Sequence, residues 1–461
     1  MGAGPIPSSG LSPRLRLAAA GYRFRESLFQ FPALIVLGGL VLAEVAALVD
    51  EAVGGERLPF TVTMNSNAAT WLLSTVAGAT ITTAGVVFSM TVVSLQLASS
   101  QFSPRVMRSF VRDRLSQLVI GLLVATFVFC VLTLRHIDGD AASAAPSVSM
   151  TVALVLVVAT VLLIIAHLNH LAGRLQVGEV VRAIFDEGEH TIRDLERQVA
   201  RERPADRVPE TGGSVLTVSA TRAGWVTQAP GDAMLYVVPE HAVVRLETRT
   251  GAYIHRGEPL ATLRLPPGTD EDRVLVDVRA AVEVSDVRTM QQDVDFALRQ
   301  LVDIGLRALS PAVNDPTTAV EAILRVAGLM RQVLAADLPA AAIEGPGGRY
   351  LLRPWSLTHE EYVAHAFDQL RQTAGSQTQV AAALLRALRM LRQYARESDR
   401  PEHLPALERQ LRMVIDSVRD RDDLHPTDRD RLLAMADDAT DPADHSPDLR
   451  PGTEAPEHRR P

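Results

Sequence analysis

The stretch that decides the fold lies between Ala68 and Ala98 and reads AATWLLSTVAGATITTAGVVFSMTVVSLQLA. It belongs to an uncharged interval that runs from Leu58 to Pro104. As a helix it would be about 45 Å long, whereas the hydrocarbon core of a bilayer is about 30 Å thick. The stretch therefore predicts a membrane helix that tilts, kinks or extends beyond the lipid.

Three further stretches are long and apolar enough to span a membrane, which gives four predicted spans. Their approximate bounds are 31–49, 68–98, 118–134 and 148–168, within a transmembrane region that covers residues 29–172. Arginine collects in the N-terminal segment 1–28 and again between the second and third spans, whereas the other two connections are mainly acidic. By the positive-inside rule, this alternation predicts that both termini are cytoplasmic.

The composition excludes several classes of protein. The chain has 461 residues, 47% of them hydrophobic, and a net charge of −8, so we expect neither a wholly disordered chain nor a nucleic-acid partner. Every one of the 46 basic residues is arginine. The lack of lysine removes P-loop, Schiff-base and protein-kinase chemistry and lipoyl or biotinyl attachment. The single cysteine, Cys130, cannot form an intrachain disulfide or a cysteine zinc site, and we expect no cofactor or metal.

Beyond the fourth span, the hydrophobic period changes twice. A charged helical extension and a linker over 173–213 precede a region of period two, 214–285, which predicts a small β domain with a strand at 236–238. The period then returns to 3.6, which predicts a helical cytoplasmic domain over 286–437 and a disordered tail over 438–461. The expected helices are 286–309, 316–336, 358–374, 377–397, 403–420 and 427–437. The fold class is therefore a mixed α and β membrane protein with a four-helix transmembrane region.

Two motifs carry a resemblance to a known family. One is ITTAGVVFSM at 81–90 with SQFSPR at 100–105, and the other is a set of positions between 288 and 319. That second set is Arg288-Thr289, Gln292-Asp293, Phe296, Gln300 to Ile304, Arg307 to Pro311 and Asn314 to Ala319. Over roughly residues 20–435 the chain resembles the bacterial predicted membrane proteins called domain of unknown function 2254. The resemblance implies a multi-pass protein of the bacterial plasma (inner) membrane with a cytoplasmic C-terminal region, and it supplies no catalytic residues.

A second resemblance lies inside the predicted β domain. The segment Thr250 to Leu260, TGAYIHRGEPL, is similar to the closing strand and turn of biotinyl, lipoyl and membrane-fusion barrel-sandwich domains. Those domains attach a prosthetic group to a lysine, and this chain has none. The resemblance therefore implies a structural or regulatory role.

Small and polar residues follow one face of the second span. They recur in steps of three, four or seven, and they are Ser74, Gly78, Thr82, Gly85, Ser89, Gln96 and Ser100. This seam either lines a pore or packs tightly against another helix, and both hold if copies of the helix surround an axis. Arg105, Arg108 and Arg112 would then form the cytoplasmic mouth. We expect Val87, about 200° around the same helix from Gly85, to tolerate substitution.

A second candidate site is a corner in the cytoplasmic region. Its residues are Asp293, Gln300, Asp303, Arg307, Asn314 and Asp315. Asp293, Gln300 and Arg307 recur every seven residues, so they share one face of a helix. Asp303 can pair with Arg307 on the next turn of that helix. Asp315 followed by Pro316 predicts the start of a helix. The corner is either a ligand or inter-subunit site, or a polar helix face followed by a capped turn.

Other polar positions within the spans have simple explanations. Glu44 lies near the outer end of the first span and either reaches the interface or is functional. His167 and His170 end the fourth span, as a hydrated helix end or as part of a metal site. No nucleophile elbow, HExxH or GxGxxG motif is present, so we expect no enzyme, although an intramembrane enzyme with unmarked residues remains a third alternative.

The functional expectation follows from these features. We expect a homo-oligomeric channel or transport-type protein that passes a small solute or ion and has a cytoplasmic regulatory region. The alternative is a membrane-anchored sensor or scaffold whose cytoplasmic domains bind a partner. A channel needs a wetted face through the bilayer, whereas a scaffold needs only a dry seam.

Overall fold

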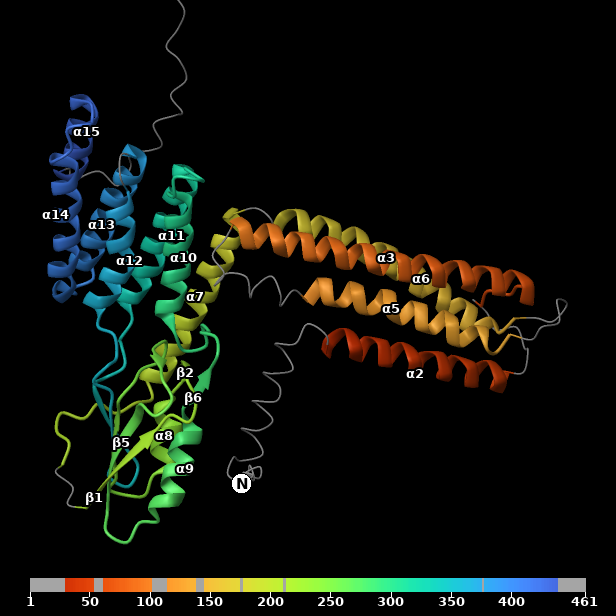
Figure 1. The fold of residues 1–461 in the computed structure, drawn as a ribbon, viewed down its shortest axis with the longest axis horizontal. Coiled ribbons are helices and arrows are strands. Elements are labelled where there is room, and N and C mark those ends of the chain that lie inside the picture. Colours follow the sequence, from red (N-terminus) through yellow and green to blue (C-terminus); the bar gives the residue numbers. More distant parts are fainter. Residues whose placement is uncertain are drawn as a thin grey trace, which may run out of the picture.

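The structure is a computed structural model, and it describes residues 30–53, 61–101, 114–137, 145–174, 177–209, 213–374 and 377–437. Its first part is a bundle of helices that extends sideways from the remainder of the molecule (Figure 1). The bundle consists of α2 (Gln30–Val53), α3 (Ser66–Gln101), α5 (Arg114–Leu134) and α6 (Ser147–Arg174). All four are long and apolar enough to cross a membrane, which confirms the predicted spans.

The bundle is organised around α5, which contacts α2, α3 and α6. Two glycines allow α2 and α5 to approach closely. A Cβ added at Gly39 would lie 2.8 Å from the Cβ of Ala125, and one added at Gly121 would lie 2.8 Å from Cδ1 of Ile35. Asp50 near the end of α2 caps α6, because its carboxylate accepts from the backbone N–H of Val148 at 2.8 Å.

The second part joins a sheet unit to a helical bundle through α7 (Val177–Val199), which follows α6 and contacts α10 and α11 of the helical bundle (Figure 1). The strands of the sheet unit are β1 (Ser214–Ser219), β2 (Gly224–Gln228), β3 (Val243–Leu246), β4 (Tyr253–Ile254), β5 (Pro259–Leu265), β6 (Glu283–Ser285), β7 (Ala342–Gly345) and β8 (Arg349–Leu352). They form a five-stranded sheet of order β1-β5-β3-β8-β7 and a three-stranded sheet of order β4-β2-β6. Two helices accompany them, α8 (Gly231–Val237) and α9 (Glu271–Ala281).

The sheet unit differs from the predicted β domain in three places, one of which is that helix α9 lies inside the region predicted as β. The strand predicted at 236–238 is wrong, because Tyr236 and Val237 end α8. Strands β7 and β8 come from inside the predicted helical domain, and β8 pairs in parallel with β3. Such pairing joins segments about a hundred residues apart and leaves no local signal in the sequence. The barrel-sandwich fold stays a prediction.

Part of the predicted linker is built into this sheet unit. The N–H of Ala205 donates to the carbonyl of Ala342 at 3.0 Å, so the linker extends the sheet beyond β7. The guanidinium of Arg353 binds the Glu202 carboxylate with two hydrogen bonds of 2.9 and 2.6 Å, and both side chains are nearly buried. The segment that leads from α7 is therefore fixed to the sheet by a bidentate ion pair.

The helical bundle contains six α-helices within the described ranges. They are α10 (Val294–Ala308), α11 (Pro316–Ala335), α12 (His359–Thr373), α13 (Thr378–Glu397), α14 (Leu404–Arg419) and α15 (Pro426–Asp437). A short 3-10 turn, η1 (Pro401–His403), precedes α14. The helix predicted over 286–309 begins eight residues later than expected, because Asp293 is its N-cap and accepts from the N–H of Phe296. The predicted tail over 438–461 and the N-terminal segment 1–28 lie outside the described residues.

Candidate functional sites: the membrane seam and the joint

The predicted seam lies on the outward face of α3. Its described members Ser74, Gly78, Thr82, Gly85, Ser89 and Gln96 are all exposed. The opposite face of α3 is buried within the described part of the chain and includes Ala69, Leu73, Ala77, Thr80, Ala84 and Val87. The side chain of Ser100, and Arg105, Arg108 and Arg112 of the predicted mouth, lie outside the described residues.

No contact between described helices requires the glycines of the seam. No described atom lies within 4 Å of a Cβ added at Gly78 or Gly85. This contrasts with Gly39 and Gly121, which are small because α2 and α5 touch there. The expectation that Val87 lies on a tolerant face is wrong, because it is buried with Val119 in the α3–α5 contact. The seam is therefore a surface of the bundle that no part of the described protomer covers.

The hydroxyls of α3 are largely satisfied by the helix itself. Thr82 Oγ1 donates to the carbonyl of Gly78 at 2.7 Å, and Thr75 Oγ1 donates to the carbonyl of Trp71 at 2.8 Å. Bonds of this kind let serine and threonine face lipid, a protein interface or water. The hydroxyls alone therefore do not decide between a pore lining and a packed seam.

The remaining polar positions of the spans do not gather into a site. His167 is buried on α6, His170 is half-buried, and Glu44 is exposed on α2. Across the described ranges, no three histidine, cysteine, aspartate or glutamate side chains are placed to hold a metal ion.

The predicted corner is divided between two environments. At its far end Asp315 caps α11, where its carboxylate accepts from the N–H and the hydroxyl of Thr318. Those bonds lower the pKa of Asp315. Asn314 has a positive φ of 46°, and its side-chain oxygen accepts from Gln377 at 3.0 Å. This half is a locally bonded, capped turn, whereas the pairing of Asp303 with Arg307 stays a prediction.

The other half of the corner belongs to a buried ionic cluster, which we call the joint. It consists of Arg288, Asp293, Asp295, Arg299 and His365. Arg288 Nε donates to Asp293 at 2.6 Å, and its Nη2 donates to Asp295 at 2.8 Å. Asp295 also accepts from Arg299 at 2.8 Å and lies 2.7 Å from His365 Nδ1. Gln300 is buried on the same helix.

The two carboxylates of the joint are held in different electrostatic states. Burial raises the pKa of Asp293, an effect larger than the lowering by Arg288. Burial also acts to raise the pKa of Asp295, but hydrogen bonds from His365, Arg288 and Arg299 outweigh it and hold the pKa well below its ordinary value. The negative charge on Asp295 is therefore stabilised by its three partners, whereas burial opposes the charge on Asp293.

The joint connects the separate parts of the extramembrane region. The Arg288 guanidinium lies 5.6 Å from the ring of Trp225 on β2 and 5.2 Å from the ring of Phe296 on α10. In the same loop, the carbonyl of Met290 accepts from the Thr191 hydroxyl of α7 at 3.0 Å. The loop over 286–293 is thus bound to the sheet unit, the helical bundle and the helix that leads from the membrane.

A glycine of the sheet unit fits against this cluster. Gly251 has a φ of +82°, and a Cβ added there would lie 2.7 Å from Nη2 of Arg288 and closer still to the Asp293 carboxylate. The segment that resembles a barrel-sandwich turn is therefore in contact with the second motif. Sequence reasoning singled out Asp293, but it missed Asp295 and His365, because a partner seventy residues away on α12 leaves no spacing signal.

The fold and these sites define a class: a membrane protein with four apolar helices and a two-part extramembrane region held by a buried ionic joint. The chain belongs to the family described as "Predicted membrane protein (DUF2254)", whose model matches residues 25–390. It is 31% identical over 408 residues to an uncharacterized protein of Mycobacterium tuberculosis (strain CDC 1551 / Oshkosh), an alignment that covers 84% of this chain and 74% of the relative. A Mycobacterium bovis protein, also uncharacterized, is equally similar over 409 residues. No solved structure matches the chain.

Proposed function

We propose that the protein is a homo-oligomeric channel or transport-type protein of the bacterial plasma membrane, with copies of α3 around a shared axis. The observation that carries this proposal is the outward position of the seam. Ser74, Gly78 and Gly85 give α3 a groove where a second backbone can approach, which is how helices associate in lipid. An exposed amide such as Gln96 is also better placed against protein or water than against lipid tails.

The length of α3 supports a role in the passage of a solute or ion, beyond anchoring the protein in the membrane. Its 36 residues correspond to about 54 Å, well beyond the roughly 30 Å of a hydrocarbon core. Copies around an axis would present seam hydroxyls and the Gln96 amide along a path through the membrane. Arg105, Arg108 and Arg112 follow α3 in the chain, and a ring of fixed positive charge favours anions. We therefore expect weak anion preference, and a cytoplasmic, regulatory extramembrane region.

A sensor or scaffold is the second candidate, and exposed aromatic residues favour it. Tyr236 on α8 is 88% exposed, and Trp355, which precedes α12, is 54% exposed. Large exposed aromatic side chains are frequent at protein–protein contacts. On this alternative, the seam only holds the membrane helices together, and the extramembrane region binds a partner.

Flux through liposomes separates the two candidates. Purified full-length protein should pass chloride faster than potassium, and protein-free liposomes give the baseline. Gly85→Leu should abolish the flux, because its side chain occupies the space needed for a second helix. Ala79→Leu is the matched control, since Ala79 is exposed and about 120° away around α3. Liposomes no leakier than the baseline across pH, voltage and tension would favour the scaffold.

A further inference from the structure

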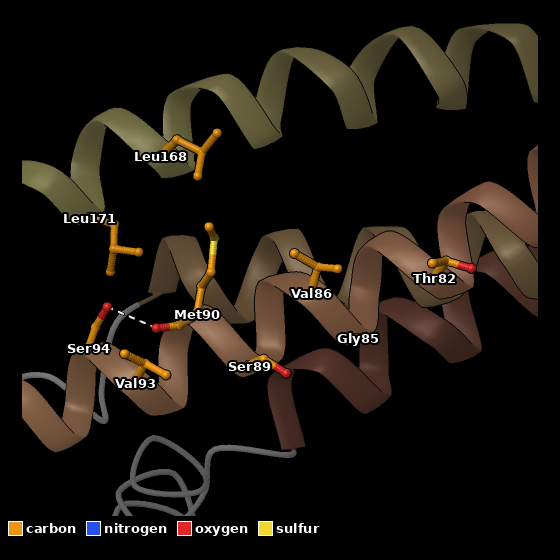
Figure 2. Close-up of a pocket in the computed structure, with 9 residues that line it drawn as sticks. All are labelled: Thr82, Gly85, Val86, Ser89, Met90, Val93, Ser94, Leu168 and Leu171. Carbon is orange, nitrogen blue, oxygen red and sulfur yellow. Dashed lines mark hydrogen bonds between the residues drawn. The ribbon is translucent and has the colours of Figure 1, made fainter.

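An open groove separates α3 from α6 near the end of the bundle that leads to α7. Figure 2 shows Met90 and Val86 of α3 facing Leu168 and Leu171 of α6 across it. The volume is about 720 Å³, far more than the small voids of a packed protein interior. The complete lining is Thr82, Gly85, Val86, Ser89, Met90, Val93, Ser94, Leu168 and Leu171.

The walls of this groove offer few hydrogen-bonding groups to water. Most of the lining side chains are aliphatic or methionine, and two of the hydroxyls are turned into their own helix. Thr82 Oγ1 donates to the carbonyl of Gly78 at 2.7 Å, and Ser94 Oγ donates to the carbonyl of Met90 at 2.9 Å. A favourable occupant is therefore flexible and apolar.

The position of the groove within the membrane spans indicates what kind of molecule occupies it. Its walls lie within two of the four apolar spans, 66–96 and 147–171, so the surrounding medium is hydrocarbon. Val86, Val93 and Leu168 are 52%, 53% and 44% exposed, which means that the groove opens sideways into this medium. In the chain, Arg174 follows Leu171 by three residues, where a fixed positive charge suits a phosphate head group.

We propose that this groove binds an acyl chain of a phospholipid from the leaflet nearest to α7. A second copy packed on the seam would border this groove, because Thr82, Gly85 and Ser89 belong to both. It would leave open the side next to α6, since Val86, Met90 and Ser94 lie about 100° to 180° around α3 from Gly85. The bound chain fills the space between α3 and α6 and so fixes the distance between them. This inference does not depend on passage or on oligomer formation.

Photolabelling of the full-length protein tests the proposal. The protein is reconstituted into nanodiscs of phosphatidylethanolamine and phosphatidylglycerol that contain a phospholipid with a diazirine near the end of one acyl chain. After irradiation, peptide mass spectrometry compares labelling at Met90 and Leu168 with labelling at Phe88 and Ile165, which are exposed at a similar depth on α3 and α6 outside the groove. We expect several-fold enrichment in the groove. Equal labelling at all four positions would overturn the proposal.

A groove-filling variant provides the second measurement. Leu168→Trp should reduce labelling at Met90 several-fold, because the indole takes the space of the acyl chain. Leu162→Trp, on an exposed position away from the groove, should leave that labelling unchanged. Met90→Cys also tests the rival occupant, since efficient disulfide formation between copies at this position would show that a second protomer fills the groove. If the liposome assay shows no ion flux while this labelling pattern is still observed, the result counts against the proposed channel function and not against lipid binding in the groove.

Discussion

Replacing Asp295 by alanine should destabilise the junction between α10 and α12 far more than an ordinary charge deletion does. Its carboxylate is 1% exposed and contacts Arg288, Arg299 and His365 at 2.8, 2.8 and 2.7 Å. Removing one partner of a buried ion pair typically costs about 3–5 kcal/mol, because the remaining charge stays buried without compensation. We expect a loss near the lower end of this range, about 3 kcal/mol, for Asp295→Ala, because Arg288 keeps Asp293 as a partner and both Arg299 and His365 are partly exposed. The loss for Asp295→Asn should be smaller, because asparagine keeps an acceptor.

Hydrogen exchange on the detergent-purified full-length protein measures this loss. A change of about 3 kcal/mol speeds the exchange of protected amides about 100-fold, and the increase should appear in α10 and α12. Asp416→Ala is the matched control, because Asp416 and its partner Arg419 are both 62% exposed, and such pairs contribute about 0–1 kcal/mol. Equal effects of the two alanine variants would refute the claim that the joint holds the extramembrane region together.

Three further predictions concern the joint and the topology. Gly251→Ala should weaken the joint by about 1–3 kcal/mol, because alanine is strained at a positive φ and its Cβ meets the Asp293 carboxylate; exchange of the 249–257 segment measures it. Because the pKa of Asp295 is lowered on folding, its contribution to stability is fully present above the unfolded pKa of about 3.9 and disappears as the pH falls through the lower folded pKa. Thermal unfolding from about pH 5 to about pH 2 should therefore show this loss, and Asp295→Asn should flatten it. A cysteine at Ala52 should react with an impermeant maleimide on intact cells, whereas one at the exposed Ala223 should react only after permeabilisation, and the reverse pattern would invert the topology.

Local patterns in the sequence were sufficient for the four long apolar helices and for α11 to α15, but not for α8, α9 or the start of α10. Long apolar runs predicted the spans, and Thr358 with Glu361 forms a capping box, a local pattern that marks a helix start, at the beginning of α12. The start of α10 was misplaced because Asp293 and Arg288 pair in a loop whose composition resembles a helix. Local propensity does not reveal that a buried ion pair ends the helical pattern.

Contacts between segments that lie far apart in the chain could not be predicted from one sequence. Strand β8 pairs with β3, and His365 reaches Asp295, only because the chain returns to the same place. The face of α3 that packs inside the protomer was also undecided, since Ala69, Ala77 and Ala84 on the inner face are as small as the seam residues. Residue size therefore predicts close packing on both faces without saying which neighbour each one meets.

Disulfide cross-linking between copies in native membranes tests the central claim, that the outward seam of α3 meets α3 of a second copy. In a Cys130→Ala background, Gly85→Cys should form a covalent dimer rapidly on mild oxidation, because close packing of two copies at this glycine would bring the Cα atoms into the range of about 4.4–6.8 Å that a disulfide requires. Met90→Cys is exposed on the same helix but about 140° away, and it should form little dimer. Absence of a dimer at Gly85, or faster dimer formation at Met90, would contradict the assembly on which the proposed function rests.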